Sequence, residues 1–242
     1  MISADTVMAG GIGSVNLSQY RIEFSEEKKS INQSMNKPPY IVPSMAEINT
    51  ISWNGLNVVS TFSGCGGSCL GYRMAGFRVL WANEFVPVAQ NNYKANAAPC
   101  SYLDTRDIRL IQPEEILAQI GLKVGEIDLL DGSPPCQSFS MAGKREKGWG
   151  KEKKYEHGAK QCNETLFDEY IRILRGLMPK VFIAENVSGL VKGTAKGYFK
   201  EILAGLKASG YNVKAQLLDA QWLGVPQMRQ RIIFQGVRND LG

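Results

Sequence analysis

The stretch that decides the fold is NVVSTFSGCGGSCLGYRMAGFRVLWANE, residues 57–84. Its apolar, β-branched start predicts a strand over 57–62, which runs into a glycine turn that opens a helix. Gly76 is the predicted end of that helix, and a second strand over 77–84 ends on Glu84. A strand, a helix and a second strand in this order are typical of a parallel sheet.

The same alternation continues along the rest of the chain. Helices are predicted over 86–96, 112–121, 164–177 and 197–210, and strands over 126–131, 180–186, 211–220 and 229–237. The pattern predicts an α/β, Rossmann-like fold, with a mostly parallel sheet that carries helices on both faces. Ligands of such sheets bind beyond the carboxyl ends of the strands, so the residues that follow each strand are the candidates for a site.

The composition is that of a soluble globular protein with a sizeable core. The chain has 242 residues, of which 44% are hydrophobic and 21% are charged. No apolar run reaches the roughly 20 residues that a membrane helix needs. The N-terminus has no basic start followed by a long apolar run, so no secretion signal is predicted. We therefore expect a cytoplasmic protein that makes no contact with a membrane.

The cysteines favour neither a disulfide framework nor a metal site. The chain has five of them, an odd number without regular spacing. Cys65 and Cys69 are four residues apart, but no second pair of Cys or His completes a zinc site, and His157 is the single histidine. We expect reduced thiols and no bound metal.

Positive charge gathers in one segment, KREKGWGKEKK, residues 144–154. The segment holds six basic and two acidic residues, and the chain as a whole has a formal net charge of +5. One interpretation is a solvated surface loop. The other is a loop that contacts phosphates, which the position shortly after Cys136 favours.

Three features that follow the first strands indicate a ligand containing adenosine. Gly64, Gly66 and Gly67 stand between the first strand and its helix, where glycine lets the backbone approach a ligand closely. Glu84 ends the second strand and can accept both hydroxyls of a ribose. Asp107 ends the segment SYLDTRD, residues 101–107, and can accept a hydrogen bond from an adenine amino group. The alternative is that both acids are ordinary exposed carboxylates or helix caps.

A single cysteine stands behind two prolines in GSPPCQSFS, residues 132–140. The prolines fix the backbone and hold the thiol of Cys136 outward, which suits a nucleophile. The alternative is a buried structural cysteine, but two prolines and a long polar loop are poor surroundings for a core. The sequence therefore indicates nucleophilic attack by Cys136.

Two later strands supply groups that can assist this attack. Glu185 follows a buried strand and can serve as an acid beside Cys136, with Asn186 to orient it or the neighbouring loop. Arg229 and Arg231 are two apart, which predicts that they share one face of a strand. One of them can bond a carbonyl oxygen of the substrate, and the other can hold the glutamate or the active loop.

Taken together, these motifs resemble those of the cytosine-5 DNA methyltransferases. The resemblance rests on FSGCGG, NE, DI, GSPPCQSFS, ENV and QMRQRI in this order, and it covers about 57–240. It implies the S-adenosylmethionine-dependent methyltransferase fold, S-adenosylmethionine as the methyl donor and S-adenosylhomocysteine as the product. Members act on double-stranded DNA and need no metal, and they are expected in bacteria or phages.

The resemblance also implies a set of cofactor-binding residues. Phe62 would stack on the adenine, Glu84 would take the ribose hydroxyls, and Asp107 would take the adenine amino group. Phe85 would cover the pocket, and Pro135 and Leu166 would line it. The implied set is Phe62, Ser63, Gly64, Cys65, Gly66, Gly67, Glu84, Phe85, Asp107, Ile108, Pro135 and Leu166.

The mechanism that the resemblance implies begins with a cytosine flipped out of the duplex. Cys136 attacks carbon 6, Glu185 bonds the ring nitrogen and the exocyclic amine, and Arg231 holds the ring oxygen. Carbon 5 then takes the methyl group, and loss of its proton and of the cysteine restores the ring. The DNA contacts implied are Gln137, Ser140, Lys144 and Arg145, within a loop that closes over DNA.

The predicted domains are an N-terminal extension over 1–55 and a methyltransferase domain over 56–242. Family members usually continue into a target-recognition region. Its lack here predicts a truncated fragment, a partner chain that supplies the region, or a permuted order in which residues 35–48 replace the final helix. Two other functions stay open, a tRNA cytosine-5 methyltransferase and a non-catalytic subunit that binds DNA or cofactor.

Overall fold

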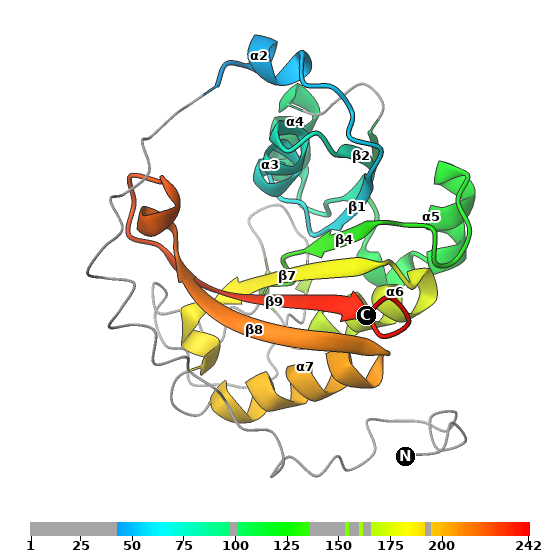
Figure 1. Ribbon diagram of the computed structural model, residues 1–242, viewed down its shortest axis with the longest axis vertical. Helices are drawn as coiled ribbons and strands as arrows, with labels where there is room; N and C mark the ends of the chain where they lie inside the picture. Colours follow the sequence, from blue (N-terminus) through cyan, green and yellow to red (C-terminus); the bar gives the residue numbers. More distant parts are fainter. Residues whose placement is uncertain (1–42, 97–100, 136–152, 155–159, 162–165, 192–194) are drawn as a thin grey trace.

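The computed structural model describes residues 43–96, 101–135, 153–154, 160–161, 166–191 and 195–242. A seven-stranded sheet with the order β3-β2-β1-β4-β7-β9-β8 forms its centre (Figure 1). The strands of this sheet are β1 (Asn57–Thr61), β2 (Arg78–Asn83), β3 (Tyr102–Asp104), β4 (Leu129–Gly132), β7 (Val181–Val187), β8 (Tyr211–Asp219) and β9 (Gln230–Arg238). A separate antiparallel pair consists of β5 (Lys153–Lys154) and β6 (Lys160–Gln161).

The large sheet is parallel except at one strand. β1 pairs in parallel with β2 and β4, β2 pairs with β3, and β4 pairs with β7. β9 runs antiparallel to both of its neighbours, β7 and β8. The mostly parallel sheet predicted from the sequence is confirmed, and the hairpin of β8 and β9 is its antiparallel part.

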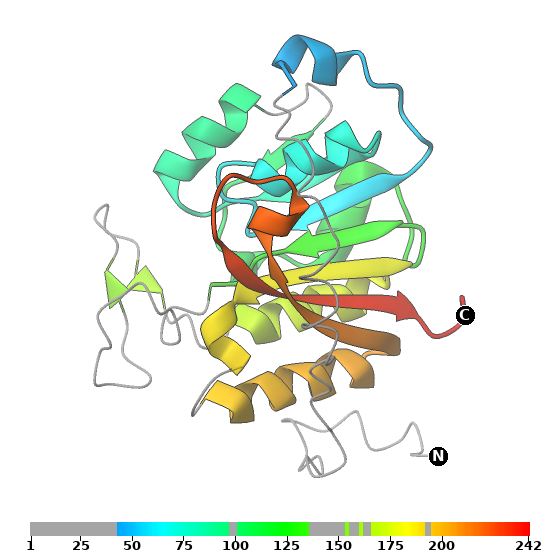
Figure 2. The ribbon, with the colours of Figure 1, turned by 60° about the vertical axis from the view of Figure 1, so that its left-hand side comes forward.

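Helices cover both faces of the sheet, as predicted (Figures 1 and 2). Their bounds are α2 (Met45–Asn49), α3 (Gly67–Met74), α4 (Pro87–Asn96), α5 (Pro113–Ile120), α6 (Leu166–Leu177) and α7 (Lys196–Ala208), with short 3-10 turns at η3 (Ile108–Leu110), η6 (Ser188–Val191) and η8 (Ala220–Leu223). On one face, α3 and α4 insert Cys69 and Tyr93 into a small cluster with Val58 and Val79. On the other face, α5, α6 and α7 pack around a larger core. No described helix is long and apolar enough to cross a membrane.

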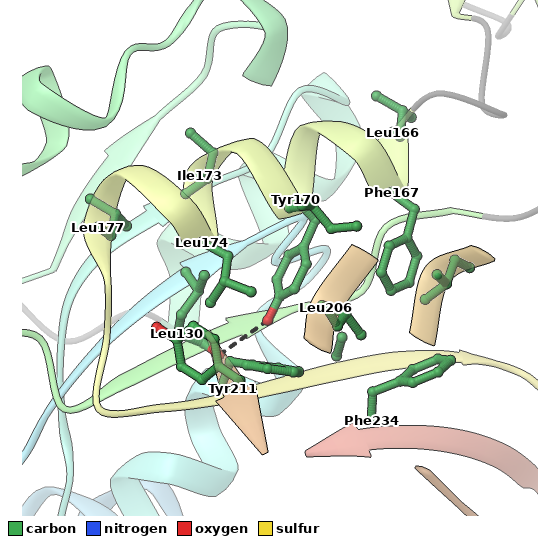
Figure 3. Packing of buried hydrophobic residues seen from close by; sticks show 14 of the residues in the cluster. Leu130, Leu166, Phe167, Tyr170, Ile173, Leu174, Leu177, Leu206, Tyr211 and Phe234 are labelled. Atoms are coloured by element: carbon green, nitrogen blue, oxygen red, sulfur yellow. Dashed lines mark hydrogen bonds between the residues drawn. The ribbon is translucent and has the colours of Figure 1, made fainter. Parts of the chain in front are cut away.

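Helix α6 places its apolar stripe against the middle of the sheet (Figure 3). The buried Tyr170 hydroxyl donates to the carbonyl oxygens of Ile183, at 3.1 Å, and Leu130, at 3.4 Å. A side chain at Gly132 would lie 2.5 Å from both the Tyr170 ring and Thr61 Oγ1. Only glycine fits at this point, so Tyr170 fixes where β4 ends and the Ser-Pro-Pro turn begins.

A short helix precedes the first strand, in a region that the sequence predicted as an extension. In α2, Ser44 and Glu47 form a reciprocal capping box. Ile48 is buried, and Asn49 Oδ1 accepts a 2.6 Å hydrogen bond from Arg73 of α3. The Ser-x-x-Glu spacing was a visible signal for this helix, and the sequence prediction did not use it.

Candidate active site

The carboxyl ends of β1, β2 and β4 surround a pocket of about 200 Å³. Its lining residues are Phe62, Asn83, Glu84, Phe85, Val86, Ile108, Ser133 and Pro135. Five of these, Phe62, Glu84, Phe85, Ile108 and Pro135, are among the cofactor residues named from the sequence. Apolar walls around a single acid suit a nucleoside, whose base is flat and whose ribose is polar.

The glycine turn that follows β1 forms one side of the pocket. Phe62 has a positive φ of 53°, which is uncommon for a bulky residue and persists only where the surroundings enforce it. Gly66 has a φ of 88°, and a side chain there would lie 3.0 Å from the Tyr93 ring. Glycine is therefore required at Gly66 by conformation and by the contact with Tyr93, and a close approach to a ligand stays a prediction. Ser63 is buried, whereas Cys65 and Gly67 are exposed.

Backbone amides from two turns fix the Glu84 carboxylate. Gly64 donates to Oε2 at 2.8 Å, and Val86 donates to Oε1 at 2.6 Å. The residue is 8% exposed, and its backbone oxygen accepts from Gln90. Each carboxylate oxygen can accept a further hydrogen bond, so the group is held in place and can still receive two ligand hydroxyls.

Asp107 lies at the start of η3, where it is already engaged. Its carboxylate caps the Arg109 amide at 3.0 Å and forms a 2.6 Å ion pair with the Arg109 guanidinium. Burial acts to raise the pKa of Asp107, but the hydrogen bonds and charge of Arg109 outweigh it and lower the pKa overall. The helix-cap role considered as an alternative is present, and a hydrogen bond to adenine stays a prediction. The next residue, Ile108, lines the pocket.

Asn186 anchors the turn that leads to the predicted nucleophile. Its Nδ2 donates to the Pro134 carbonyl at 3.2 Å, and its Oδ1 accepts from the Val187 amide at 2.8 Å. The side chain is 2% exposed, so this link between β7 and the Ser-Pro-Pro turn is shielded from water. Cys136, Gln137, Ser140, Lys144 and Arg145 lie outside the described residues, as does His157.

Glu185 and Arg231 meet across the β7–β9 pairing. Arg231 Nε lies 2.6 Å from Glu185 Oε1, and both side chains are about one third exposed or less. Arg231 Nη1 also donates to the Gln230 carbonyl at 2.8 Å. Of the two roles open to the arginines, holding the glutamate is the one that Arg231 fills here.

Arg229 differs from its expected setting. It lies one residue before β9 rather than within the strand, and a face shared with Arg231 stays a prediction. It is exposed, and its backbone amide donates to Asp219 at 3.2 Å.

Leu166 also differs from its predicted place. It is fully buried at the start of α6, within the large core, and it is not among the residues that line the pocket (Figure 3). Its part in cofactor binding stays a prediction.

Three lining residues were not singled out from the sequence: Asn83, Val86 and Ser133. Asn83 is 2% exposed, and its amide donates to the carbonyls of Asp104, at 3.1 Å, and Arg106, at 2.8 Å. It thereby holds the ends of β2 and β3 together. A polar residue at the end of an apolar strand, directly before Glu84, was the signal for it.

This sheet order and this pocket define a methyltransferase domain of the S-adenosylmethionine-dependent class. The chain belongs to the C-5 cytosine-specific DNA methylase family, whose model matches residues 56–242. The resemblance seen in the sequence motifs is therefore confirmed.

Similar proteins include bacterial Type II methyltransferases. M.NgoPII of Neisseria gonorrhoeae is 36% identical over 197 residues, which are 81% of this chain and 52% of that protein. M.FnuDI of Fusobacterium nucleatum is 37% identical over 186 residues, which are 77% of this chain and 48% of that protein. The chain thus spans about half the length of these relatives.

Solved structures agree on the fold. The structure of an E. coli prophage protein assigned as a DNA modification methyltransferase has a TM-score of 0.62 and 29% identity, covering 77% of this chain and 48% of its own. DNMT2 of Spodoptera frugiperda has a TM-score of 0.56 and 24% identity, covering 77% of this chain and 51% of its own. The second likeness shows the fold alone.

Proposed function

We propose that residues 56–242 are the catalytic domain of a DNA cytosine-5 methyltransferase, with residues 1–55 as an N-terminal extension. The observation that carries the proposal is the meeting of three features at one edge of the sheet. These features are the Glu84 pocket, the Ser-Pro-Pro turn and the Glu185–Arg231 pair. A cofactor pocket and a carboxylate held by an arginine at one edge can serve a single transfer reaction.

The pocket residues suit S-adenosylmethionine, which would supply the methyl group when bound. Phe62 and Phe85 would hold the adenine by their faces and edges. The Glu84 oxygens, fixed by Gly64 and Val86, would accept the ribose hydroxyls. Asp107 would accept from the adenine amino group with the lone pairs that Arg109 leaves open. The predicted residues of the glycine turn, 63–67, would contact the cofactor through their backbone atoms.

The chemistry on the base falls to three residues. Cys136 directly follows Pro135 of the pocket wall, and its thiolate would attack carbon 6 of cytosine. Glu185 would hydrogen-bond the ring nitrogen and the exocyclic amine as charge develops there. Arg231 would keep Glu185 in place through Nε and offer Nη2 to the ring oxygen. Carbon 5, made nucleophilic by this attack, would take the methyl group, and loss of its proton to a base and of the Cys136 thiolate would restore the ring.

The substrate in this proposal is double-stranded DNA, from which one cytosine is flipped at a cost of a few kcal/mol. Gln137, Ser140, Lys144 and Arg145 would contact the DNA, and the basic segment 144–154 would neutralise phosphates. The relatives are named Type II methyltransferases, which supports a modification role in restriction–modification in a bacterial cytoplasm. A partner chain that carries the target-recognition region stays a prediction.

The test is covalent trapping on DNA whose cytosines are replaced by 5-fluorocytosine. Fluorine at carbon 5 cannot leave as a proton does, so the Cys136 adduct should persist on a denaturing gel in the presence of S-adenosylmethionine. Cys136→Ala should abolish the adduct, and Cys162→Ala should not. Trapping on tRNA with 5-fluorocytosine in place of DNA would instead support the tRNA alternative. An adduct that survives in Cys136→Ala would overturn the proposal.

A further inference from the structure

A second acid, Asp131, lies buried behind the pocket, and the proposed reaction gives it no part. It is the third residue of β4, it pairs in register with Ser60 of β1 and Ile183 of β7, and it is 4% exposed. The next residues along the chain are Gly132, where β4 ends, and Ser133, which lines the pocket. Asp131 therefore lies within the sheet, two residues before the pocket wall.

Three hydroxyl groups surround the Asp131 carboxylate. Ser60 Oγ and Ser68 Oγ donate to Oδ2 at 3.0 and 2.8 Å, and Tyr72 Oη donates to Oδ1 at 3.0 Å. Ser63 extends the network, because its hydroxyl donates to the carbonyl and the hydroxyl of Ser60. The ion pairs found among the described residues do not include Asp131.

A carboxylate is a costly residue for this place if only stability matters. Burial raises the pKa of Asp131, the three hydroxyls lower it, and the charge of Glu185 raises it again, with a raised pKa overall. Apolar residues of similar volume often stabilise a core better than buried charges do. What a carboxylate adds is geometry, because it accepts several hydrogen bonds at once and donates none.

The donors lie on both sides of the glycine turn. Ser60 precedes the turn at the end of β1, and Ser68 and Tyr72 follow it in the first two turns of α3. The N-cap of α3 is Gly66, which has no side chain to cap the helix. Asp131 thus joins the two ends of the turn, and the positive end of the α3 dipole favours a negative charge beside it.

We propose that Asp131 is a positioning residue that fixes the glycine turn of the cofactor pocket against the strand leading to Cys136. This inference rests on the proposed function, because it assigns the pocket to a cofactor. Through Ser60, Ser68 and Tyr72, the carboxylate sets the place of the Phe62 ring and of the Gly64 amide that holds Glu84. Asp131 itself touches neither cofactor nor substrate.

The test compares Asp131→Asn with Asp128→Asn in the 242-residue chain. Asp128 is a matched control, because it is 9% exposed and directly precedes β4, at the amino end of the strand that contains Asp131. Its carboxylate accepts hydrogen bonds from the Asn57 amide and from Lys180. An asparagine has one acceptor oxygen, so Asp131→Asn should weaken binding of S-adenosylhomocysteine by about tenfold or more in calorimetry. Asp128→Asn should change this affinity less than about threefold.

Hydrogen exchange supplies a readout that does not need the ligand. The peptide amides of residues 62–72 should exchange faster in Asp131→Asn than in wild type, while those of β8 and β9 should not change. A general loss of stability would speed exchange everywhere. If Asp131→Asn does not fold, Ser68→Ala and Tyr72→Phe, which each remove one donor, should show the same local exchange and a smaller loss of affinity.

The outcomes separate the inference from the proposed function. Wild-type affinity in Asp131→Asn, or equal losses in Asp131→Asn and Asp128→Asn, would overturn the positioning role and leave the cofactor site intact. A folded wild-type chain that does not bind S-adenosylhomocysteine would count against the proposed function. In that case, exchange of residues 62–72 would still decide whether Asp131 holds the turn.

Discussion

Glu84 and Asp131, at the carboxyl edge of the central sheet, are held differently from Asp128, at the amino edge. At the amino edge, Asp128 is neutralised by Lys180 Nζ at 2.7 Å and also accepts from the Asn57 amide. At the carboxyl edge, Glu84 is held by two backbone amides and Asp131 by three hydroxyls. An ion pair satisfies a charge locally, whereas neutral donors hold an acid in place and leave its charge available. Other carboxyl-edge acids have cationic partners, as Asp104 and Asp107 do in Arg106 and Arg109, so the difference singles out Glu84 and Asp131 and not the whole edge.

Glu185 occupies an intermediate position in this comparison. It lies at the carboxyl edge but has a cationic partner, Arg231. The pair is partly exposed, so it remains accessible to a substrate. A carboxyl group that must contact a flipped cytosine needs such access. Asp131 is buried and can act only through its neighbours.

The largest effect expected at the carboxyl edge is on turnover. Glu185→Gln should lower the rate of methyl transfer by about 10²–10⁴-fold, the usual contribution of a positioned acid. Its affinity for S-adenosylhomocysteine should stay near wild type, because Glu185 does not line the pocket. Single-turnover kinetics with DNA and calorimetry together measure both effects. An unchanged rate would remove Glu185 from the mechanism.

The next effect concerns the end of β4. Gly132→Ala should destabilise the fold by about 3 kcal/mol, because the new methyl group would overlap Thr61 and the buried Tyr170 ring. Gly197→Ala is the control, since a methyl group there meets nothing within 4 Å. Urea unfolding measures both. Equal stability of the two variants would show that Tyr170 does not constrain this turn.

A smaller effect is expected where α6 supports the pocket wall. Arg172 Nη2 donates to the carbonyls of Ile108, at 2.9 Å, and Ile111, at 3.0 Å, while Nε pairs with Glu169 at 2.7 Å. Arg172→Lys keeps the charge but loses this fork, so stability should fall by about 1–2 kcal/mol. Affinity for S-adenosylhomocysteine should also fall several-fold. If Arg172→Lys leaves stability and affinity at their wild-type values, Arg172 does not support the pocket wall.

The smallest effect belongs to the amino edge. Lys180→Met removes the partner of Asp128, and because the lysine side chain is 46% exposed the pair should contribute about 1 kcal/mol or less. The loss should shrink further at high salt. Affinity for S-adenosylhomocysteine, measured by calorimetry, should not change. A large loss of affinity would break the distinction between the edges.

Most of the carboxyl edge could be predicted because its signals are local. The glycine turn and Glu84 each follow an apolar strand directly, Glu185 lies near the carboxyl end of β7, and parallel strands bring such positions to one edge. The role of Asp131 could not be predicted, because its hydrogen-bond partners are distant in the sequence. Ser60, Ser68 and Tyr72 precede it by 71, 63 and 59 positions. The Asp107–Arg109 and Glu185–Arg231 pairs likewise depended on side-chain packing that periodicity does not specify.

The central claim is that the carboxyl edge holds an adenosine-containing cofactor through Glu84. The most direct measurement is a calorimetric titration of the 242-residue chain with S-adenosylhomocysteine, for wild type, Glu84→Gln and Asp128→Asn. We expect one binding site in wild type, affinity lowered about tenfold or more in Glu84→Gln, and little change in Asp128→Asn. Equal affinity in wild type and Glu84→Gln, or no binding by a folded wild-type chain, would contradict the account.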